Sequence, residues 1–406
     1  MMIFLLSIAP GMALGQTRQA SDVVSRYRNI FIAAPSRIPS TFSVDAPLLG
    51  NGFTAVAIAG DPESQTYYLA RNDFWRLKSG LNTSFPAALG SLRIHIPALK
   101  GAGYKIEQDL YTATTNATFS KGDTIIRMRS IVAATQDLLL IDITNNGKAE
   151  MVGSVELSLP DSDQLQAKDR FPDTTSTGRT AGGVQWLLRG FVKEVDTATI
   201  ATAACKIVGS TGDRFKLAPG KRISIVCALS SRFKGPDPLQ RVMETVRNIT
   251  NQSILGTIEK HRSWWRSFWN ESFVDIGDSL IEHQYYRSQY NMAACCRDPK
   301  FPPGIFGSWI TKEIPAWNGD YHLNYNYSAP FYALYSSNHL QQALPYDAPL
   351  IAFMPRGRFY SGNLTSIPDG ILYPVGIGPL GIETTRLKPD EGMFWGQKSN
   401  AAYCVT

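Results

Sequence analysis

The chain of 406 residues has the composition of a folded protein that is long enough for two or three domains. Hydrophobic residues make up 44% of it, aromatic residues 11% and charged residues only 18%. The formal net charge of +6 is scattered, and no run of Lys or Arg is long enough to follow a phosphate backbone. This composition excludes a disordered chain and argues against a nucleic-acid partner.

The first fifteen residues have the features of an export signal. A short apolar run ends in Ala13-Leu14-Gly15, which offers small residues at the two positions that a signal peptidase reads. We therefore expect residues 1–15 to be a signal peptide and the protein to be secreted or extracellular. A membrane contact is expected only through an uncleaved signal, because a spanning helix needs about 20 apolar residues.

Asn-X-Ser/Thr tripeptides fit an extracellular glycoprotein, although such tripeptides also arise by chance. The sequence has them at Asn82, Asn116, Asn248, Asn251, Asn270, Asn326 and Asn363. A glycan on Asn326 would block the candidate site described below. We expect burial to leave that asparagine unmodified.

The first half of the chain has the texture of β-structure. Residues 91–96 alternate between polar and apolar side chains, and the apolar run 137–143 leads to Asn145-Asn146-Gly147, which favours a tight turn. Many short strands of this kind predict an antiparallel β-sandwich over residues 16–233. Cys205 and Cys227 lie in neighbouring apolar runs and form either a disulfide or two buried thiols.

The period changes near residue 236. Trp265, Trp269 and Phe273 recur every four residues, which predicts an amphipathic helix with an aromatic face inside a helical linker over residues 234–274. A second helix is expected from about Ser279 to Cys296, because Pro302-Pro303-Gly304 cannot continue it.

The rest of the chain alternates between helix-like and loop-like stretches. Residues 318–339 have a helix-compatible pattern, residues 345–392 are rich in Pro and Gly and predict a long loop, and residues 396–406 begin another helix. The loop carries Glu383 and the pair Asp390-Glu391, which we interpret as solvated charges. Among them, Glu383 is the best candidate for a contact with the wall of a site.

The densest group of chemically active side chains lies between Trp309 and Tyr327. Aromatic faces stack on the apolar faces of a sugar ring, while carboxylates and amides bind vicinal hydroxyls. If the segment is helical from Tyr321, His322 and Asn326 lie on one helix face. The alternative is an aromatic-rich helix start with Asp320 as its N-cap. The candidate sugar-binding residues are Trp309, Trp317, Asp320, His322, Asn324 and Asn326.

The string WNGDYHLNYNY resembles the W-x-GD-[YF]-H-x-N-x-N motif of family 95 glycoside hydrolases, the α-L-fucosidase family of the six-hairpin glycosidases. Residues 47–52 and 72–75 resemble the N-terminal sandwich of that family, and residues 303–309 resemble the entry to its barrel. The resemblance implies an α+β multidomain chain: a galactose-mutarotase-like supersandwich, a helical linker and the first part of an (α/α)6 barrel over residues 275–406. That stretch is too short for all the helices of such a barrel.

The same resemblance implies inverting hydrolysis of a glycosidic bond in an oligo- or polysaccharide, in which one carboxylic acid protonates the leaving oxygen and a second carboxylate activates water. Asn324 and Asn326 match the asparagines that contact substrate and help to position this water, and His322 matches a histidine of the same subsite. The acid and base of the family come from later segments, which leaves Glu383 and Asp320 as weak catalytic candidates. Ser328 replaces a Gln that fucosidases carry, so the sugar stays open.

Two alternative functions also involve a bound sugar but not hydrolysis: a non-catalytic carbohydrate-binding protein and a glycoside phosphorylase of the same fold. We expect no cofactor. We also expect no metal, because the histidines outside the motif lack metal-ligand spacing. An incomplete barrel would leave Trp309, Trp317 and Trp395 poorly covered, which predicts poor solubility.

Overall fold

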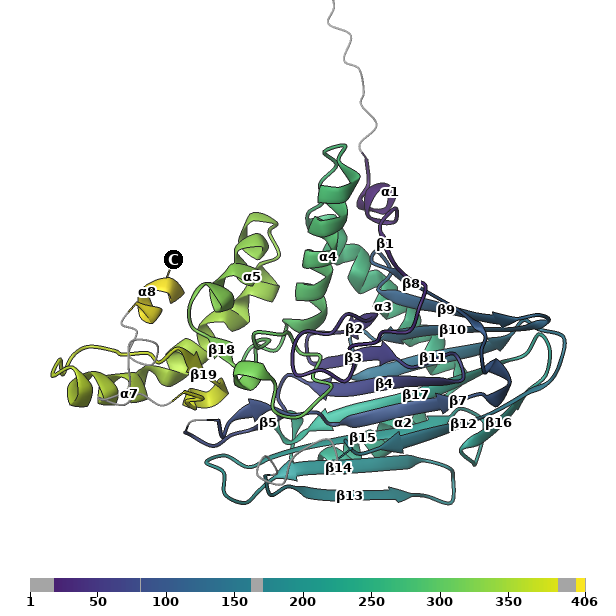
Figure 1. Cartoon of the computed structure of the whole chain (residues 1–406), viewed down its shortest axis with the longest axis horizontal. Helices are drawn as coiled ribbons and strands as arrows, with labels where there is room; N and C mark the ends of the chain where they lie inside the picture. The colour runs from purple at the N-terminus through teal and green to yellow at the C-terminus, as the bar shows by residue number, and fades with distance from the viewer. Residues whose placement is uncertain (1–17, 81, 162–170, 386–398, 406) are drawn as a thin grey trace, which may run out of the picture.

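The computed structural model describes residues 18–80, 82–161, 171–385 and 399–405 and has two large antiparallel sheets beside a group of helices (Figure 1). The nine-stranded sheet has the order β1 (Arg28–Phe31), β8 (Gly103–Asp109), β9 (Thr114–Lys121), β10 (Thr124–Val132), β11 (Leu138–Asn145), β17 (Arg222–Ser231), β15 (Thr199–Ile207), β14 (Gln185–Phe191), β13 (Thr174–Arg179). The six-stranded sheet has the order β16 (Arg214–Leu217), β12 (Met151–Ser158), β7 (Gly90–His95), β4 (Ser64–Arg71), β3 (Thr54–Ala59), β2 (Leu48–Gly50). A small pair, β5 (Trp75–Arg76) and β6 (Phe85–Pro86), lies apart from both.

The two sheets share one apolar core. Leu92 and Ile94 of β7 belong to the same buried cluster as Leu139 and Ile141 of β11 on the opposite sheet. Strand β7 alternates between buried and more exposed residues, as a half-buried strand should. Strand β11 is buried on both faces, because Leu138 and Leu140 on its outer side belong to a second buried cluster with residues of helices α2 (Pro238–Asn248) and α3 (Asn251–Glu271).

The turn predicted at Asn145-Asn146-Gly147 is present, and the N–H of Gly147 donates to Oδ1 of Asn145 at 2.9 Å. It does not close a hairpin. Strand β11 pairs with β10 and β17, whereas β12 pairs with β7 and β16. The turn therefore carries the chain from one sheet to the other.

Cys205 and Cys227 lie directly opposite each other on β15 and β17. Both are fully buried free thiols in the structure, and burial raises the pKa of the Cys205 thiol to about 12. The structure therefore supports two buried thiols and not a disulfide between Cys205 and Cys227.

The aromatic helix predicted around Trp265 is α3 (Asn251–Glu271), and the second predicted helix is α4 (Ser279–Cys295). Trp265 stacks on Tyr290 of α4 at a centroid distance of 5.2 Å, and Trp269 meets the edge of Tyr286 at 5.7 Å. These rings form the buried interface between the two helices, to which the short helix α1 (Ala20–Val24) also contributes. Phe273 lies just beyond the end of α3.

The prediction of a helix from Tyr321 is wrong. Tyr321 and His322 form strand β18, which pairs with β19 (Gly376–Ile377), and helix α5 (Tyr325–Ser336) begins only afterwards. Long-range pairing across more than fifty residues decides the backbone here, and no local pattern could indicate it.

The predicted loop over residues 345–392 is also wrong in its first part, which forms the long helix α7 (Asp347–Leu364). Pro349 is tolerated because the first N–H groups of a helix have no partner inside it, although Pro355 lies in the helix interior. The remaining helices are α6 (Leu340–Ala343), α8 (Asn400–Cys404), and the 3-10 turns η1 (Pro97–Leu99), η4 (Arg232–Lys234), η5 (Ala316–Gly319), η6 (Leu344–Tyr346) and η7 (Pro379–Gly381).

Figure 1 shows the sheets on one side, the helices α5, α7 and α8 on the other, and α4 between them. The α+β class is confirmed, since the chain combines these sheets with helices. The supersandwich type, the (α/α)6 barrel and the boundaries at 233/234 and 274/275 stay predictions. None of the helices in the described residues is both long enough and apolar enough to cross a bilayer.

Candidate functional site

A cavity of about 280 Å³ lies where the loop before η5 and the start of α5 meet α4 and strand β2. Three of the six predicted sugar-binding residues line it: Trp309, His322 and Asn326. Its other walls are mostly apolar and aromatic. No carboxylate belongs to the wall among the residues that the structure describes. The lining residues outside the prediction include Val44, Leu48, Asn291, Met292, Phe306, Tyr327 and Phe331.

The two-sheet region holds the wall of this cavity in place. Nε1 of the buried Trp309 indole donates to the carbonyl of Leu49 in β2 at 2.8 Å. The buried Asn72 amide donates to the carbonyls of Cys295 and Phe301 at 2.6 and 3.1 Å, which ties the segment after β4 to the chain that enters the cavity. Sheet and cavity are therefore one packed unit.

Asp320 is fully buried and lies behind His322. Its Oδ1 accepts a hydrogen bond from Nδ1 of His322 at 3.1 Å, and its Oδ2 accepts one from the Thr384 hydroxyl. Burial raises the pKa of the Asp320 carboxyl, while the hydrogen bond and charge interaction with His322 oppose that rise. Asp320 thus fixes the imidazole ring and leaves Nε2 for a ligand. It is not the N-cap of a helix, since it ends η5 instead.

Gly376 leaves the space that the Asp320 carboxylate occupies. A Cβ at this position would lie 2.1 Å from Oδ2 of Asp320 and 2.5 Å from Oγ1 of Thr384. In the ladder of β18 and β19, Gly376 is the partner of His322. Sequence reasoning missed both Gly376 and Thr384; the glycine-rich string from Gly376 to Pro379 was the available signal.

Trp317 does not line the cavity but stands beside it. Its ring lies 5.9 Å from the His322 ring and stacks at 6.2 Å on Phe306, which does line the cavity. The side chain is 58% exposed, whereas Trp309 is only 7% exposed. Trp317 is thus poorly covered as predicted, Trp309 is not, and Trp395 lies outside the described residues.

The backbone beside the site is strained. Trp317 and Asn318 have φ values of 49° and 57°, in the left-handed region that side chains with a Cβ avoid. Residues held in such conformations cost about 1–3 kcal/mol each and are concentrated at functional sites. The strained turn places Trp317 in the solvent next to His322.

The two motif asparagines have different positions. Oδ1 of Asn324 accepts from the N–H of Asn326 at 3.0 Å, so Asn324 is the N-cap of α5 and its side chain is used by the helix. Asn326 is exposed and lines the cavity. The structure therefore brings His322 and Asn326 together, and leaves Asn324 and Asp320 outside the lining.

Glu383 is not a solvated loop charge. It is 4% exposed, accepts a hydrogen bond from the Tyr360 hydroxyl and lies 3.7 Å from Arg356 of α7. Its neighbour Thr384 contacts Asp320, whereas both side-chain partners of Glu383 belong to α7, so Glu383 faces α7 and does not line the cavity. Asp390 and Glu391 lie outside the described residues.

The site has no signs of a metal centre in the residues that the structure describes, where no group of three His, Cys, Asp or Glu side chains has the geometry to hold an ion. His261 and His339 instead serve helix packing. His261 bridges α3 to the sheet region, and His339 stacks on Phe268 at 3.9 Å.

No protein-family model matches the sequence. A segment of 119 residues, 24% of this chain, is 25% identical to "Probable alpha-fucosidase A" of Aspergillus niger and covers 15% of that protein.

Among solved structures, "Putative kojibiose phosphorylase from human microbiome" matches with a TM-score of 0.60 and 14% identity, over 89% of this chain and 53% of that one. A family GH92 α-mannosidase from Bacteroides thetaiotaomicron matches with a TM-score of 0.29 and 10% identity over 74% of this chain and 45% of that one, too weakly to carry an argument. The chain thus spans about half the length of the phosphorylase and far less of the fucosidase. Over the matched residues it has an α+β fold like that of the phosphorylase structure.

Proposed function

We propose that this protein acts on carbohydrates and binds a sugar ring in the cavity of Trp309, His322 and Asn326. The observation that carries the proposal is the His322 imidazole, held from behind by the buried Asp320 and facing a hollow with aromatic walls. A cavity of about 280 Å³ lies just below the range of about 300–1,000 Å³ for ligand sites, which suits one sugar ring.

The cavity wall combines hydrogen-bonding groups for sugar hydroxyls with aromatic rings for the apolar face of a sugar ring. With Nδ1 of His322 engaged by Asp320, Nε2 can accept a hydrogen bond from a hydroxyl. The Asn326 amide offers one acceptor and two donors, and the rings of Trp309 and Phe306 suit the apolar face of a pyranose. A neutral glycan fits this lining better than a charged one, because the described wall carries no carboxylate, Lys or Arg.

For the whole protein we propose inverting hydrolysis of a glycosidic bond, supported by the likeness to the fucosidase. Such a reaction uses two carboxyl groups about 6.5–9.5 Å apart. The described cavity wall offers neither, and Glu383 faces away from it, so the acid and base would come from residues outside the described part. The described residues then form the sugar-binding side of the site.

The experiment is a calorimetric titration of the purified chain with a panel of neutral monosaccharides and aryl glycosides. His322→Ala and Asn326→Ala should each weaken binding by about 10-fold, since each loses hydrogen bonds to the sugar. Asn363→Ala, an exposed asparagine on α7, is the matched control and should bind like the wild type. If no sugar of the panel binds, or the variants bind as well as the wild type, the proposal fails.

A phosphorylase is the second candidate, because the solved structure with the higher TM-score is described as one. It would use inorganic phosphate in place of water. Phosphate-dependent release of a sugar 1-phosphate by the protein would favour it over hydrolysis, and release of free sugar without phosphate would exclude it.

We also propose that the protein is secreted and carries glycans, in line with the signal at residues 1–15, which lies outside the described residues. The side chains of all seven Asn-X-Ser/Thr asparagines are exposed. The expected burial of Asn326 is therefore wrong, because it stands at the open end of the first turn of α5. Full glycan occupancy at Asn326, measured by mass spectrometry, would contradict its role in the cavity.

A further inference from the structure

A second hollow, of about 780 Å³, lies between helices α2 and α3 over the ends of β11 and β17. We call it the α2–α3 groove and define it by Ser230, Lys234, Arg241, Ser253, Thr257 and Lys260. It shares no lining residue with the sugar cavity. Its volume is within the range of ligand sites and exceeds what one sugar ring fills.

Three cations from three different elements line this groove. Lys234 belongs to η4, Arg241 to α2 and Lys260 to α3. In the described part of the chain none of the three forms an ion pair with a carboxylate. A single surface Lys or Arg without an ion pair is common. Three such cations that line one groove together create a positive electrostatic potential in it.

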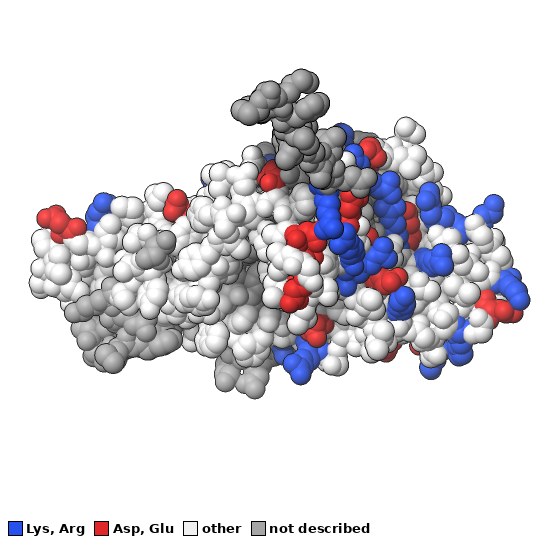
Figure 2. Space-filling model, turned by 90° about the horizontal axis from the view of Figure 1, so that it is seen from above, with Lys and Arg blue, Asp and Glu red and all other residues white. Residues whose placement is uncertain are grey.

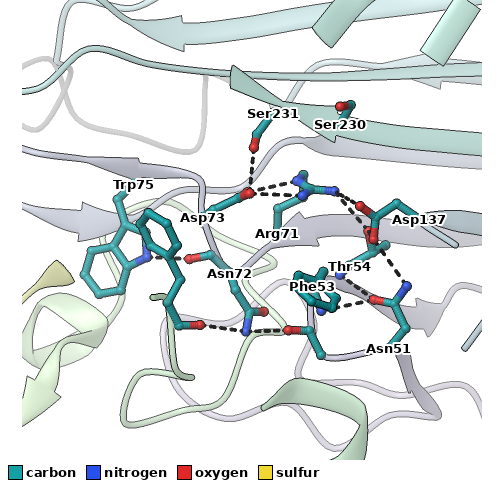
Figure 3. A network of polar contacts seen from close by, with 12 residues as sticks. Asn51, Phe53, Thr54, Arg71, Asn72, Asp73, Trp75, Asp137, Ser230 and Ser231 are labelled. Carbon is teal, nitrogen blue, oxygen red and sulfur yellow. Dashed lines mark hydrogen bonds and ion pairs between the residues drawn. The ribbon is translucent and has the colours of Figure 1, made fainter. Parts of the chain in front are cut away.

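The single carboxylate of the groove is already neutralised. Oδ2 of Asp137 accepts from the buried Arg71 guanidinium at 3.0 Å, and Oδ1 accepts from Asn51 and Thr54 (Figure 3). Burial alone would raise the pKa of Asp137, but the Arg71 ion pair outweighs it and holds the pKa below its usual value. Asp137 therefore stays ionised and is balanced mainly by Arg71, with a smaller charge interaction from Lys234.

Other contacts position the cations at the groove. The Lys234 ammonium lies 3.5 Å from the centre of the Phe53 ring, a cation–π contact that holds it at the rim. Nη1 of Arg241 donates to Oγ of Ser230 at 3.4 Å on the groove floor. Hydroxyl groups of Ser253 and Thr257 and the amide of Asn248 lie along the same walls and can bind neutral hydroxyls.

We propose that the α2–α3 groove binds an acidic oligosaccharide through the carboxylate or sulfate groups on its sugars. The unpaired cations supply charge-assisted hydrogen bonds to these oxyanions, and the hydroxyl and amide groups between them bind the neutral parts of the same chain. The ligand is a saccharide and not a nucleic acid, because three cations among many hydroxyl groups suit widely spaced charges and not a phosphate on every unit. This groove binds its ligand independently of the sugar cavity.

The test is a titration of the full chain with an oligogalacturonate, a chondroitin sulfate oligosaccharide and the neutral maltotriose at low and moderate salt. One or both acidic sugars should bind, and the stronger of the two identifies carboxylate or sulfate as the recognised group. Maltotriose should not compete, and binding should weaken as salt rises.

Arg241→Gln and Lys260→Gln should each weaken binding of the acidic sugar by about 10-fold. Lys221→Gln, an exposed lysine at the start of β17, is the control for net charge and should bind like the wild type. His322→Ala should also bind the acidic sugar normally, which separates this groove from the proposed sugar cavity.

Three results would overturn the proposal: no binding of either acidic sugar, equal binding by the groove variants and the wild type, or equally tight binding of a short single-stranded DNA. Thermal melting of each variant shows whether it is folded, so a lost affinity with an unchanged melting temperature counts as support.

Discussion

The two-sheet region and the C-terminal helical segment treat their apolar residues differently. The sheets enclose most of theirs in a shared core, and large apolar strand residues that stay exposed, such as Ile30 of β1 and Val152 of β12, are scattered. Helices α5, α7 and α8 leave large apolar side chains exposed, and Figure 2 shows one face on which Lys, Arg, Asp and Glu gather over the sheets but are sparse over these helices. The exposed residues of this segment include Tyr332, Tyr335, Leu344, Ile351, Phe359, Ile367, Tyr403 and Val405.

The helical segment, unlike the two sheets, leaves a continuous apolar surface uncovered. Residues such as Tyr332, Tyr335 and Ile351 border one groove of about 630 Å³ between α5 and α7, so the exposed apolar surface is continuous there. Contiguous apolar surface of this kind marks an interaction surface or a source of aggregation. Substitutions in the sheets should therefore change the free energy of unfolding, whereas substitutions on the outer face of the helices should change solubility.

Arg71→Met should destabilise the sheets most. The change leaves the buried Asp73 and the part-buried Asp137 without the cation that they share, and breaking a buried ion pair such as Arg71–Asp73 costs about 3–5 kcal/mol. Urea unfolding measures the effect. Lys148→Met removes an exposed pair with Asp123 and should cost less than about 1 kcal/mol. Equal losses of unfolding free energy in the two variants would mean that the Arg71 network stabilises the fold no more than an exposed ion pair does.

Ile141→Ala tests the shared core directly. Ile141 is fully buried between the sheets, and truncating such a side chain costs about 2–5 kcal/mol through lost burial and the cavity left behind. The same urea experiment should show a lower midpoint with an unchanged slope. A loss near zero would show that the two sheets do not pack against each other as described.

His261 makes the link between α3 and the sheets sensitive to acid. Its Nδ1 accepts from the N–H of Ala134 at 3.2 Å, which requires a neutral ring, and burial lowers its pKa from 6.5 to about 4. The contribution of His261 to the free energy of unfolding is therefore fully present above about pH 6.5 and is lost as the pH falls toward 4. The reason is that His261 in the unfolded chain binds a proton at a higher pH than in the folded protein. Between pH 7.5 and 5 the loss from this residue should be about 2 kcal/mol.

His261→Gln removes the titration, so the difference between the unfolding free energies of wild type and variant should shrink toward acid. A difference that stays constant from pH 7.5 to pH 5 would contradict the assignment, since other titrating groups are common to both proteins.

Ile351→Ser should change stability least, within about 0.5 kcal/mol, because the side chain is 63% exposed. It should nevertheless reduce self-association, which light scattering at rising protein concentration measures. Scattering identical to the wild type would show that this face does not cause aggregation.

The same contrast explains what the sequence could predict. Period-two alternation placed β7 and the apolar run placed β11, and the aromatic repeat located α3, because these signals are local. The His322 site could not be derived in the same way. Its backbone depends on pairing with Gly376, and the position of the Asp320 carboxylate on a hydrogen bond from Thr384, both more than fifty residues away. The motif therefore pointed to residues of which three line one cavity, but its first part forms a strand where the local pattern favoured a helix.

The most direct test of the sugar site observes the His322 ring itself. Long-range proton–nitrogen NMR of the imidazoles separates Nδ1 from Nε2, and the His322 signals are identified by their absence in His322→Gln. Adding a neutral monosaccharide that binds should shift the Nε2 signal of His322 saturably while Nδ1 keeps its bond to Asp320. If that signal does not move with any sugar of the panel, the cavity is not a sugar site.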